Sequence, residues 1–486
     1  YMFSGASDYN QALDKWDVSS VRDMSHMFEN TVSFNQSIGN WIVSKVEDMS
    51  YMFYNIFAFN QALNAWDVSS VKNMSNMFAL SQNFDKPLNG WHVDSVMDMS
   101  SMFYFTSFNQ PIDNWKVSQV EDMSNMFFIS SFNQPLNSWE VTSVQNMSGM
   151  FQAAMAFNQP LNNWQVDSVT DMSYMFSSAS AFNQPIGNWT VSKVTNMSGM
   201  FFNALIFDQP LENWDVSSVR DMSSMFAGTQ DFNQPLHMWE VSMVENMSSM
   251  FSNALAFDQP LTGWIVSTVT DMSWMFAQTS AFNQPLQGWD VSAVTDMSYM
   301  FYFSESFNQP LENWDVSGVV DMSYMFNQAL SFNQPLGKWD MQSVEHMKDM
   351  FYNTMDPAMD IQSYDQTLIG WSQQAVKPMV DLGAINLIYC ATDARDILTG
   401  TFQWDITGDT PGMGSSSSFL SLMGSWYADP NNWSNMTFPT FCTDVTIPVN
   451  TEIIIQPGNI GMGKTLAVEA GAILEVPLGS ELEIRP

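Results

Sequence analysis

The chain repeats itself about every 25 residues, and this period constrains its fold more than any other feature. The pair Met-Phe recurs from Met2-Phe3 and Met27-Phe28 onward to Met350-Phe351, and the step shortens to 24 residues only before Met126 and Met150. One such unit buries too little surface to fold alone, so neighbouring units must stack and share a core. The repeat therefore predicts a solenoid.

The spacing of apolar residues inside a unit indicates the kind of solenoid. Residues 161–176 read Leu-Asn-Asn-Trp-Gln-Val-Asp-Ser-Val-Thr-Asp-Met-Ser-Tyr-Met-Phe. The Leu, Trp and Val have the L-x-x-L-x-L spacing of leucine-rich repeats. Trp164 and Val166 predict a short strand with Gln165 outward, and Asp171 is expected to cap a short helical turn. The predicted fold is a leucine-rich-repeat-like solenoid of 14–15 coils, each with a short parallel strand and a helical turn.

The residues that recur once per unit are interpreted as structural. Fourteen of the 19 Trp form one ladder from Trp16 to Trp339, and most of the 41 Met occupy the paired Met positions. A thioether is flexible enough to fill space between coils. The Asn of Phe-Asn-Gln, as at Asn35 and Asn60, is expected to bond backbone groups of the neighbouring coil. These columns predict a continuous core rather than a cofactor site.

The repeat as a whole resembles a known family. Its motif is Trp-x-Val-Ser-x-Val-x-Asp/Asn-Met-Ser-x-Met-Phe followed by Phe-Asn-Gln-Pro-Leu, it covers residues 1–355, and it is similar to the repeat of BspA-like leucine-rich-repeat surface proteins. The resemblance implies a secreted or cell-surface bacterial protein that binds or adheres to a protein or glycan ligand. It implies no catalytic residues.

Two further segments follow the repeats. Residues 356–411 are interpreted as a cap, with a degenerate last coil at 364–371 and a helix after it. The Gly- and Ser-rich residues 412–418 predict a linker. Residues 419–486 contain short alternating strands between Gly, Pro and Asn, which predicts a small β-rich module. That module resembles those toward the C-termini of Bacteroidota surface proteins, where a sorting domain for type IX secretion often follows; no such domain is in this sequence.

The charge is strongly one-sided and excludes some partners. Lys and Arg number 14 against 50 Asp and Glu, a net charge of −36. Such a surface repels phosphate backbones and anionic lipids, so we expect neither nucleic acid nor bare membrane as a partner. No run of 18 apolar residues exists that could span a membrane. Cations, cationic protein patches and neutral glycans remain compatible, and the solubility of an exported protein equally explains the acidity.

Cysteines and possible modification sites lie at few positions. Cys390 and Cys442 lie outside the repeats and are either one disulfide of an oxidising compartment or two separate thiols. Ser95 and Ser168, each within Asp-Ser-Val, resemble an O-glycosylation motif of Bacteroidota. Because Tyr1 begins partway through a repeat without a signal peptide, we expect the chain to be a piece of a longer precursor.

No motif predicts catalysis. Residues 458–465 match the nucleotide-binding pattern G-x-x-x-x-G-K-[ST], but only 21 residues follow Thr465, too few for a nucleotide-binding fold, so a β-turn is expected. The four His lie in different coils at different positions and form no metal or triad pattern. Two carboxylates suffice for a glycosidase, yet carboxylates are so abundant here that this criterion discriminates nothing. We predict no enzyme and no cofactor, with weak Ca²⁺ binding left open.

The best binding candidates are the outward residues between Trp and Val. Eight of 14 coils have a carboxylate there, and like charges one strand spacing apart repel unless a counter-ion or cationic partner lies between them. The alternative is a solvated acidic face. The predicted concave binding face consists of Asp17, Asp67, Glu140, Asp215, Glu240, Asp290, Asp315 and Asp340.

The leading functional hypothesis is an extracellular bacterial adhesion or binding protein that presents this acidic surface. The second is a structural spacer or accessory subunit of an outer-membrane assembly, docked through residues 419–486. A third is a secreted glycan-active enzyme with the repeats as an appendage.

Overall fold

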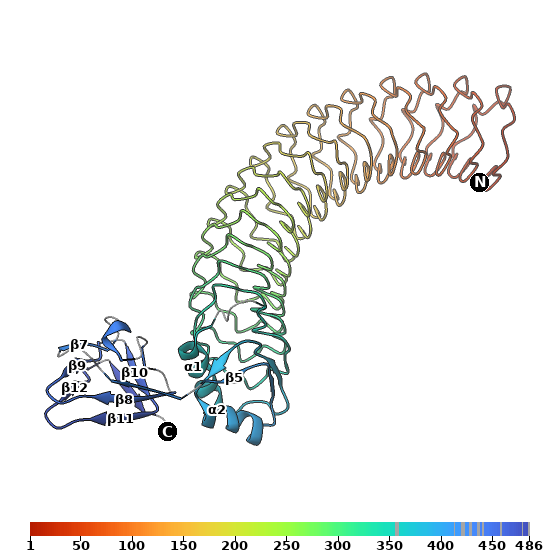
Figure 1. Ribbon diagram of the computed structural model, residues 1–486. Coiled ribbons are helices and arrows are strands. Elements are labelled where there is room, and N and C mark those ends of the chain that lie inside the picture. Colours follow the sequence, from red (N-terminus) through yellow and green to blue (C-terminus); the bar gives the residue numbers. More distant parts are fainter. Residues whose placement is uncertain are drawn as a thin grey trace. The chain divides into compact units, whose positions relative to one another are not determined.

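The computed structural model describes residues 1–354, 359–412, 414–418, 423–426, 430–434, 438–439, 442–456, 459–478 and 480–484. The chain divides into two compact units, which are described separately (Figure 1). The first comprises Tyr1–Val294 with Tyr299–Ser304, and the second Thr295–Ser298 with Glu305–Pro486. The first unit therefore holds most of the repeats, and the second holds the last repeats and everything after them.

The coils of the first unit are joined by a parallel backbone ladder at the Asp or Asn that precedes Met-Ser. Single bridges link Asp23 to Asp48 and Asp48 to Asn73, and the series continues to Asp271. From this Met onward, every second backbone amide donates to a carbonyl oxygen of the next coil, as from Met24 N to Asp48 O at 2.9 Å. Residues 1–345 contain no helix and no strand longer than one such bridge.

The predicted positions of strand and helical turn are therefore wrong. The inter-coil ladder runs through Asp-Met-Ser rather than Trp-x-Val. No helical turn follows because two residues per coil are left-handed, such as Tyr51 and Asn55, both with φ of 55°, and a left-handed residue interrupts a right-handed helix. Asp48 instead closes a tight turn by accepting from the Ser50 amide at 2.8 Å.

The core of the repeats consists of the predicted ladders. The indole N–H of Trp164 donates to the carbonyl oxygen of Leu136 in the preceding coil at 2.9 Å, and Trp164 is 2% exposed. The Asn ladder is confirmed as well: Asn35 Oδ1 accepts from the Asn60 amide at 3.0 Å and from Gln61 Nε2 at 2.9 Å. Side chains therefore connect each coil to the next at the positions where the backbone does not.

The spacing of stacked rings shows that the first unit is curved. Ring centroids in the Trp ladder lie 6.5 Å apart for Trp41 and Trp66, whereas those of Phe28 and Phe53 lie 5.9 Å apart. Rings at the residue between Met-Ser and Met-Phe are closest, at 4.6 Å for His26 and Tyr51. The Asp-Met-Ser side is thus concave and the Trp-x-Val side convex, and Figure 1 shows the N-terminus on the inner side of the curve.

Within the second unit the repeats stack in the same way and then end. Trp371 donates to the carbonyl oxygen of Leu336 at 3.0 Å, as the ladder Trp residues do. Residues 364–371, predicted to be a degenerate coil, nevertheless lie in a helix, because Asp360 caps it by accepting from the Ser363 amide at 2.8 Å. Parallel strands β1, β2 and β4 pair in that order, and β3 pairs with β5. The elements are β1 (His346–Met347), α1 (Ile361–Ser372), β2 (Asp381–Gly383), β3 (Ile388–Tyr389), α2 (Thr392–Asp396), the π-helical η1 (Ile397–Thr401), β4 (Asp405–Thr407) and β5 (Thr410–Pro411).

One ion pair stabilises the segment that contains these elements. Arg395 donates to both carboxylate oxygens of Asp409, at 2.7 and 2.8 Å, and Tyr364 donates to the same carboxylate at 3.1 Å. The Asp409 side chain is fully buried. Burial, with the Asp409 charge beside it, raises the pKa of Tyr364.

The C-terminal strands form a second, shorter coil. Every pair is parallel, with the orders β6-β8-β11, β7-β9-β12 and β10-β13. Asp444 pairs with Thr465, Glu452 with Ile473, and Ile460 with Glu481, each at an offset of 21 residues. The preceding turn is longer, because Ser415 pairs with Thr443 and Met423 with Glu452. The strands are β6 (Ser415–Ser418), β7 (Met423–Ser425), β8 (Thr443–Ile447), β9 (Glu452–Ile454), β10 (Ile460–Gly463), β11 (Thr465–Val468), β12 (Ile473–Glu475) and β13 (Glu481–Ile484), with the 3₁₀ turn η2 (Pro430–Asn432) after β7.

Two sequence predictions change in this region. The predicted linker 412–418 includes strand β6, which pairs with β8 and so is part of the coil. Within the described part of the nucleotide-binding match, β10 and β11 follow each other without a helix, so no helix N-terminus is available for phosphate. Short strands do occur within 419–486 as predicted, but β6 in the predicted linker, β10 in the predicted β-turn and the winding into parallel coils were not predicted.

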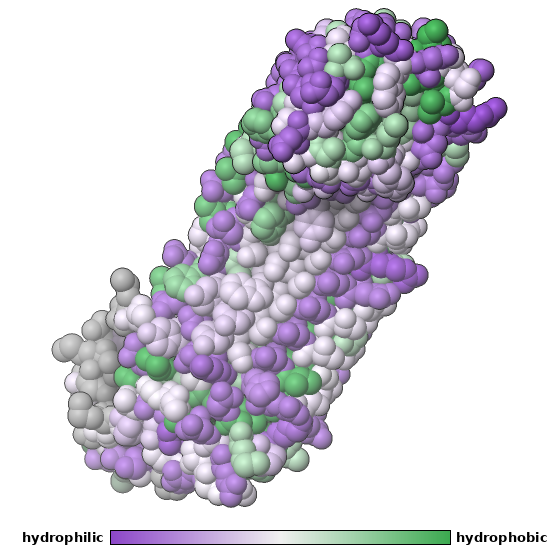
Figure 2. All heavy atoms as spheres, turned by 90° about the vertical axis from the view of Figure 1, so that its right-hand side faces the viewer, coloured by the Kyte–Doolittle hydropathy of each residue, from purple (hydrophilic) through white to green (hydrophobic). Residues whose placement is uncertain are grey.

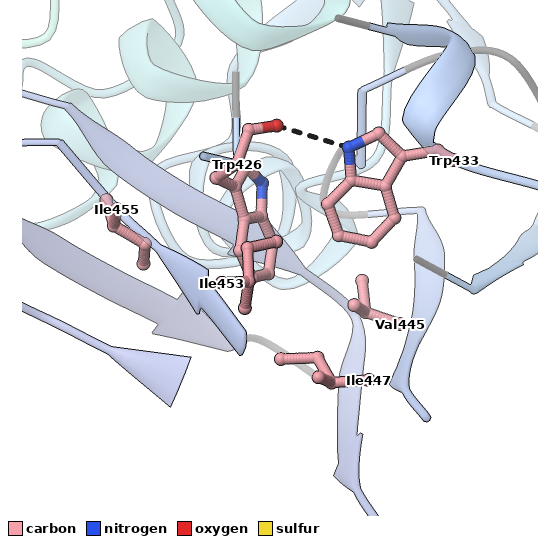
Figure 3. Packing of buried hydrophobic residues seen from close by; sticks show 6 residues of the cluster. All are labelled: Trp426, Trp433, Val445, Ile447, Ile453 and Ile455. Atoms are coloured by element: carbon pink, nitrogen blue, oxygen red, sulfur yellow. Dashed lines mark hydrogen bonds between the residues drawn. The ribbon is translucent and has the colours of Figure 1, made fainter. Parts of the chain in front are cut away.

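A small apolar core fills the C-terminal coil (Figure 3). Trp433 donates its indole N–H to the carbonyl oxygen of Trp426 at 3.1 Å, and their rings meet at 60°. Aliphatic side chains from β8 and β9 complete the cluster. Its buried members are Trp426, Trp433, Val445, Ile447, Ile453 and Ile455.

Cys390 and Cys442 are joined by a disulfide in the structure, with Cα atoms 4.9 Å apart. This bond connects the segment after β3 to the segment before β8. No helix among the described residues is both long and apolar enough to cross a membrane.

Candidate functional site

The eight predicted carboxylates lie between Trp and Val, on turns rather than on a strand. In the first unit this is the convex side, so their placement on a concave strand was wrong; their role in binding stays a prediction. Each Asp closes a local turn: Asp67 accepts from the Ser69 hydroxyl at 2.6 Å and from its amide at 3.2 Å. These bonds lower the pKa of Asp67. The same turn forms at Asp17, Asp215, Asp290, Asp315 and Asp340, and Glu240 accepts from the hydroxyl of Ser242.

One polar groove includes a predicted residue. Its volume is about 370 Å³, and Glu140 is the only carboxylate in its lining, which consists of Asn137, Ser138, Trp139, Glu140, Thr142, Asn163 and Gln165. The predicted acidic surface is therefore distributed over many coils and does not converge on one pocket. Of the two glycosylation candidates, Ser95 is exposed and Ser168 half-buried, and their modification stays a prediction.

The concave side of the first unit presents a different set of side chains. The residue between Met-Ser and Met-Phe, here called the concave column, has a positive φ in every coil from His26 to Tyr299. Its aromatic or His members are half-buried or exposed: His26, Tyr51, Tyr174, Trp274 and Tyr299, with Tyr1 at the same position before Met2-Phe3. In Figure 2, viewed from the side toward which the curve of Figure 1 opens, a pale band of residues with hydropathy near zero runs beside hydrophilic columns. The Ser, Gly and aromatic residues of this region have such values.

Bulky residues are costly in this column. Tyr174 has a φ of 56° and Trp274 a φ of 60°, a conformation that glycine and Asn adopt far more readily. The chain itself places Gly199 and Asn76 at the same position. Because each strained residue costs on the order of 1 kcal/mol or more, the aromatic side chains are not explained by the local backbone. Strain of this kind is a pointer to function.

The largest aromatic group on the concave side surrounds Trp274. The Trp274 and Tyr299 rings stack with centroids 4.0 Å apart and planes 9° apart. Tyr302 stands across both, at 5.6 Å and 60° from Trp274 and 5.4 Å and 67° from Tyr299. Phe303 packs on Tyr302 and is 39% exposed. These four residues are called the aromatic corner.

Sequence reasoning missed this surface because it treated the repeat as uniform. The concave column is one of the few variable positions in an otherwise constant Met-Ser-x-Met-Phe motif, and an aromatic residue at a variable position is the signal that was available. The structure adds that the position is left-handed and outward-facing.

The described residues contain no group of three or more His, Cys, Asp or Glu side chains that could hold a metal ion. The Nδ1 atom of His26 lies 3.0 Å from the carboxylate oxygen Oε2 of Glu29, and the His26 ring stacks on Tyr51. His92 and His237 are exposed, and His346 lies in β1. No two of these His lie in the same coil.

Comparison with protein families identifies the repeats. Residues 1–91, 104–209, 181–289 and 270–380 match the model of DUF285, described as a Mycoplasma protein of unknown function. The chain belongs to the DUF285 family. No curated protein matches it.

One solved structure with detectable similarity is the crystal structure of a TLR13-ssRNA13 complex. It shares 8% identity and a TM-score of 0.19 with this chain, over 93% of this chain and 64% of that one. This chain thus spans less than two thirds of the length of that neighbour. A TM-score this low supports no conclusion about fold or ligand.

Proposed function

We propose that this DUF285 chain is a non-catalytic binding or adhesion protein of a bacterial cell surface, and that it holds its ligand on the concave side of the first unit. The observation that carries the proposal is the aromatic side chains at strained, left-handed positions of the concave column. Curved solenoids commonly use the concave side for binding, because it surrounds a ligand with side chains from several repeats.

Three features support an extracellular location. The disulfide between Cys390 and Cys442 is of the kind that persists in oxidising compartments. The net charge of −36 suits an exported, soluble surface. The repeat resembles that of BspA-like surface proteins. A family built of tandem repeats also favours an interaction role over catalysis.

The test is cross-linking mass spectrometry on intact source cells with a carboxylate-reactive cross-linker. Amine-reactive reagents are unsuitable because no Lys lies between Lys193 and Lys338. Asp221 and Asp271 flank the concave column, whereas Asp215 and Asp290 lie on the convex side. Reproducible partner links from the first pair are expected. Links only from the second pair would contradict binding on the concave side.

A second function has one observation in its favour. The last coil leaves apolar side chains exposed: Ile473 is 54% exposed, Val468 45% and Leu478 fully. An outer-membrane protein that covers this end would make the chain a spacer or accessory subunit of a surface assembly. A chain ending at Gly412 is then expected to lose its attachment to the envelope, and retained attachment would contradict this alternative.

A further inference from the structure

We propose that the aromatic corner and the concave carboxylates beside it bind a positively charged, Lys- or Arg-containing segment of a partner protein. The proposal rests on the proposed function, since it names the ligand class of the same concave surface. It depends on three observations: a Trp face on which no other ring packs, carboxylates in the neighbouring column of the same coils, and the absence of Lys and Arg between Arg220 and Lys338.

Trp274 is half-buried, and only one of its faces is covered by a stacked ring. Tyr299 of the next coil stacks on this face at 4.0 Å, and the preceding coils have small residues in the same column, Ser249 and Ser224. Among the described residues of the first unit, no aromatic ring packs on the opposite face. Trp is the side chain whose face attracts cations most strongly, and Tyr302, tilted by 60°, forms a side wall of the same corner.

Carboxylates occur three residues before the concave column, at Asp271 in the coil of Trp274 and at Asp221 two coils earlier. Asp221 and Asp271 belong to the bridge ladder, alternating with Asn196 and Asn246. Each Asp uses one oxygen to accept from the amide of a Ser two residues on, at 2.8 and 2.9 Å. Both are half-buried, so a cation that approaches Trp274 meets negative charge with reduced solvent screening.

The surroundings contain no competing cations. No Lys or Arg occurs between Arg220 and Lys338, and Arg220 itself is paired with Glu245 at 2.9 Å. An acidic surface of this kind attracts a basic partner and repels an acidic one. A neutral glycan would use the aromatic rings but gain nothing from the charge, so a cationic protein segment fits the observations better.

In the experiment, a synthetic 12-residue peptide of alternating Lys and Ser is titrated into the full chain by calorimetry. A peptide of the same length with alternating Glu and Ser is the control. Trp274→Ser introduces the residue that the preceding coil has at Ser249, and it is expected to weaken binding about five- to thirty-fold. The double change Asp221→Asn and Asp271→Asn keeps the turn, as Asn196 and Asn246 show, and is expected to weaken it several-fold. The matched convex pair, Asp215→Asn and Asp290→Asn, removes equal charge and is expected to change affinity less than about twofold.

Several results would overturn the proposal. If the concave and convex pairs weaken binding equally, the attraction is unspecific. If Trp274→Ser has no effect, or the Lys-Ser peptide does not bind, the aromatic corner is not a cation site. Binding of cellohexaose or maltohexaose that Trp274→Ser abolishes, without peptide binding, would reject the cationic class yet leave the concave binding function intact. Failure of the binding function itself appears separately, as absent concave cross-links on cells.

Discussion

The 25-residue coils of the repeats and the 21-residue coils at the C-terminus stack in the same parallel manner but are held together differently. In the repeats the backbone bonds between coils are concentrated on the concave side, from Asp-Met-Ser through Met-Phe, as at Met24 and Phe28. Side chains supply most of the connections elsewhere, as Trp164 and Asn35 illustrate. In the C-terminal coils three regular strands per turn carry the connections, and the core is largely aliphatic.

The difference shows two ways in which a coil that cannot fold alone is bonded to its neighbours. A side-chain ladder works only if each coil places the same residue at the same position, since the donor, acceptor or ring must meet its copy in the next coil. A strand ladder uses backbone groups that every residue possesses. We therefore expect the two regions to respond differently when single residues are changed.

The largest expected loss of stability follows from removing an aromatic side chain from the shorter coil. Trp433→Ala removes a fully buried ring and the donor to Trp426, a loss of about 3–5 kcal/mol. A core this small has little stability to spare, so residues 442–484 are expected to lose protection in hydrogen exchange followed by mass spectrometry.

Trp164→Ala is the matched change in the repeats. It deletes the same chemical group, yet its consequences are expected to remain within a few neighbouring coils because stability in a repeat array is a sum of local terms. Exchange protection lost along the whole of residues 1–294 would show that the repeats are as cooperative as a globular core, and the comparison would then fail.

Removing the disulfide is expected to affect only one of the two regions. Cys390 and Cys442 are 52 residues apart, and closing a loop of that length contributes up to roughly 4 kcal/mol in the chain-entropy description. In the double variant Cys390→Ser and Cys442→Ser, calorimetry is expected to show a lower transition for the C-terminal coils and an unchanged one for the repeats. A reductant should lower the transition temperature of the C-terminal coils in the parent chain and leave that of the double variant unchanged. A shift in the transition temperature of the repeats would argue against independent regions.

The same contrast explains how much the sequence could predict. The solenoid, its Trp core and its Asn ladder were predictable because side-chain ladders leave identical residues at a fixed period. The 21-residue period was not, because strands pair through the backbone: Ile453 and Leu474 occupy equivalent places beside neighbours that share no motif. The position of the inter-coil ladder was also missed, since a left-handed φ at Tyr51 or Trp274 has no sequence signature when the residue is aromatic.

The predicted binding residues were placed on the wrong side of the coil for a related reason. Alternation around Trp-x-Val is compatible with a strand and with a turn, and only the ring spacings show which side of the coil is compressed. Asp67 and its equivalents were correctly placed outward. Their local bonds to Ser69 and its equivalents make them turn-closing groups; the Ser recurs in the motif, but its bond to the Asp was not inferred.

A smaller effect tests the Asn ladder itself. Asn158 Oδ1 accepts from the Asn183 amide at 3.1 Å and from Gln184 Nε2 at 2.9 Å. Asn158→Ala is expected to lower the free energy of unfolding by roughly 1 kcal/mol, measured by urea denaturation. Asn158→Asp is expected to be nearly neutral, because Asp208 accepts the equivalent bonds from the Asn233 amide and Gln234 Nε2 of the next coil. Equal losses from both changes would mean that the amide's own N–H groups, rather than its acceptor oxygen, matter.

The smallest effect is a pH dependence carried by the turn-closing carboxylates. Bonds from the side chains and amides of Ser25 and Ser69 lower the pKa values of Asp23 and Asp67 below the ordinary 3.8. Because these folded-state pKa values are depressed, their stabilisation is present above the unfolded value of about 3.9 and is lost as the pH falls through the folded value. The thermal midpoint of the repeats is thus expected to fall below about pH 3.8 through this contribution.

Protonation also relieves repulsion among the 50 acidic residues, so the contribution of the turns must be isolated by difference. The variant Asp23→Asn with Asp67→Asn keeps an acceptor oxygen at both positions but cannot titrate; Asn73 and Asn146 accept the same bond at the position equivalent to Asp23. Between pH 5 and 2.5 its thermal midpoint should fall less steeply than that of the parent chain. Parallel curves would show that these turns are equally stable with a neutral carboxyl group, and that acid acts on the repeats only through their overall charge.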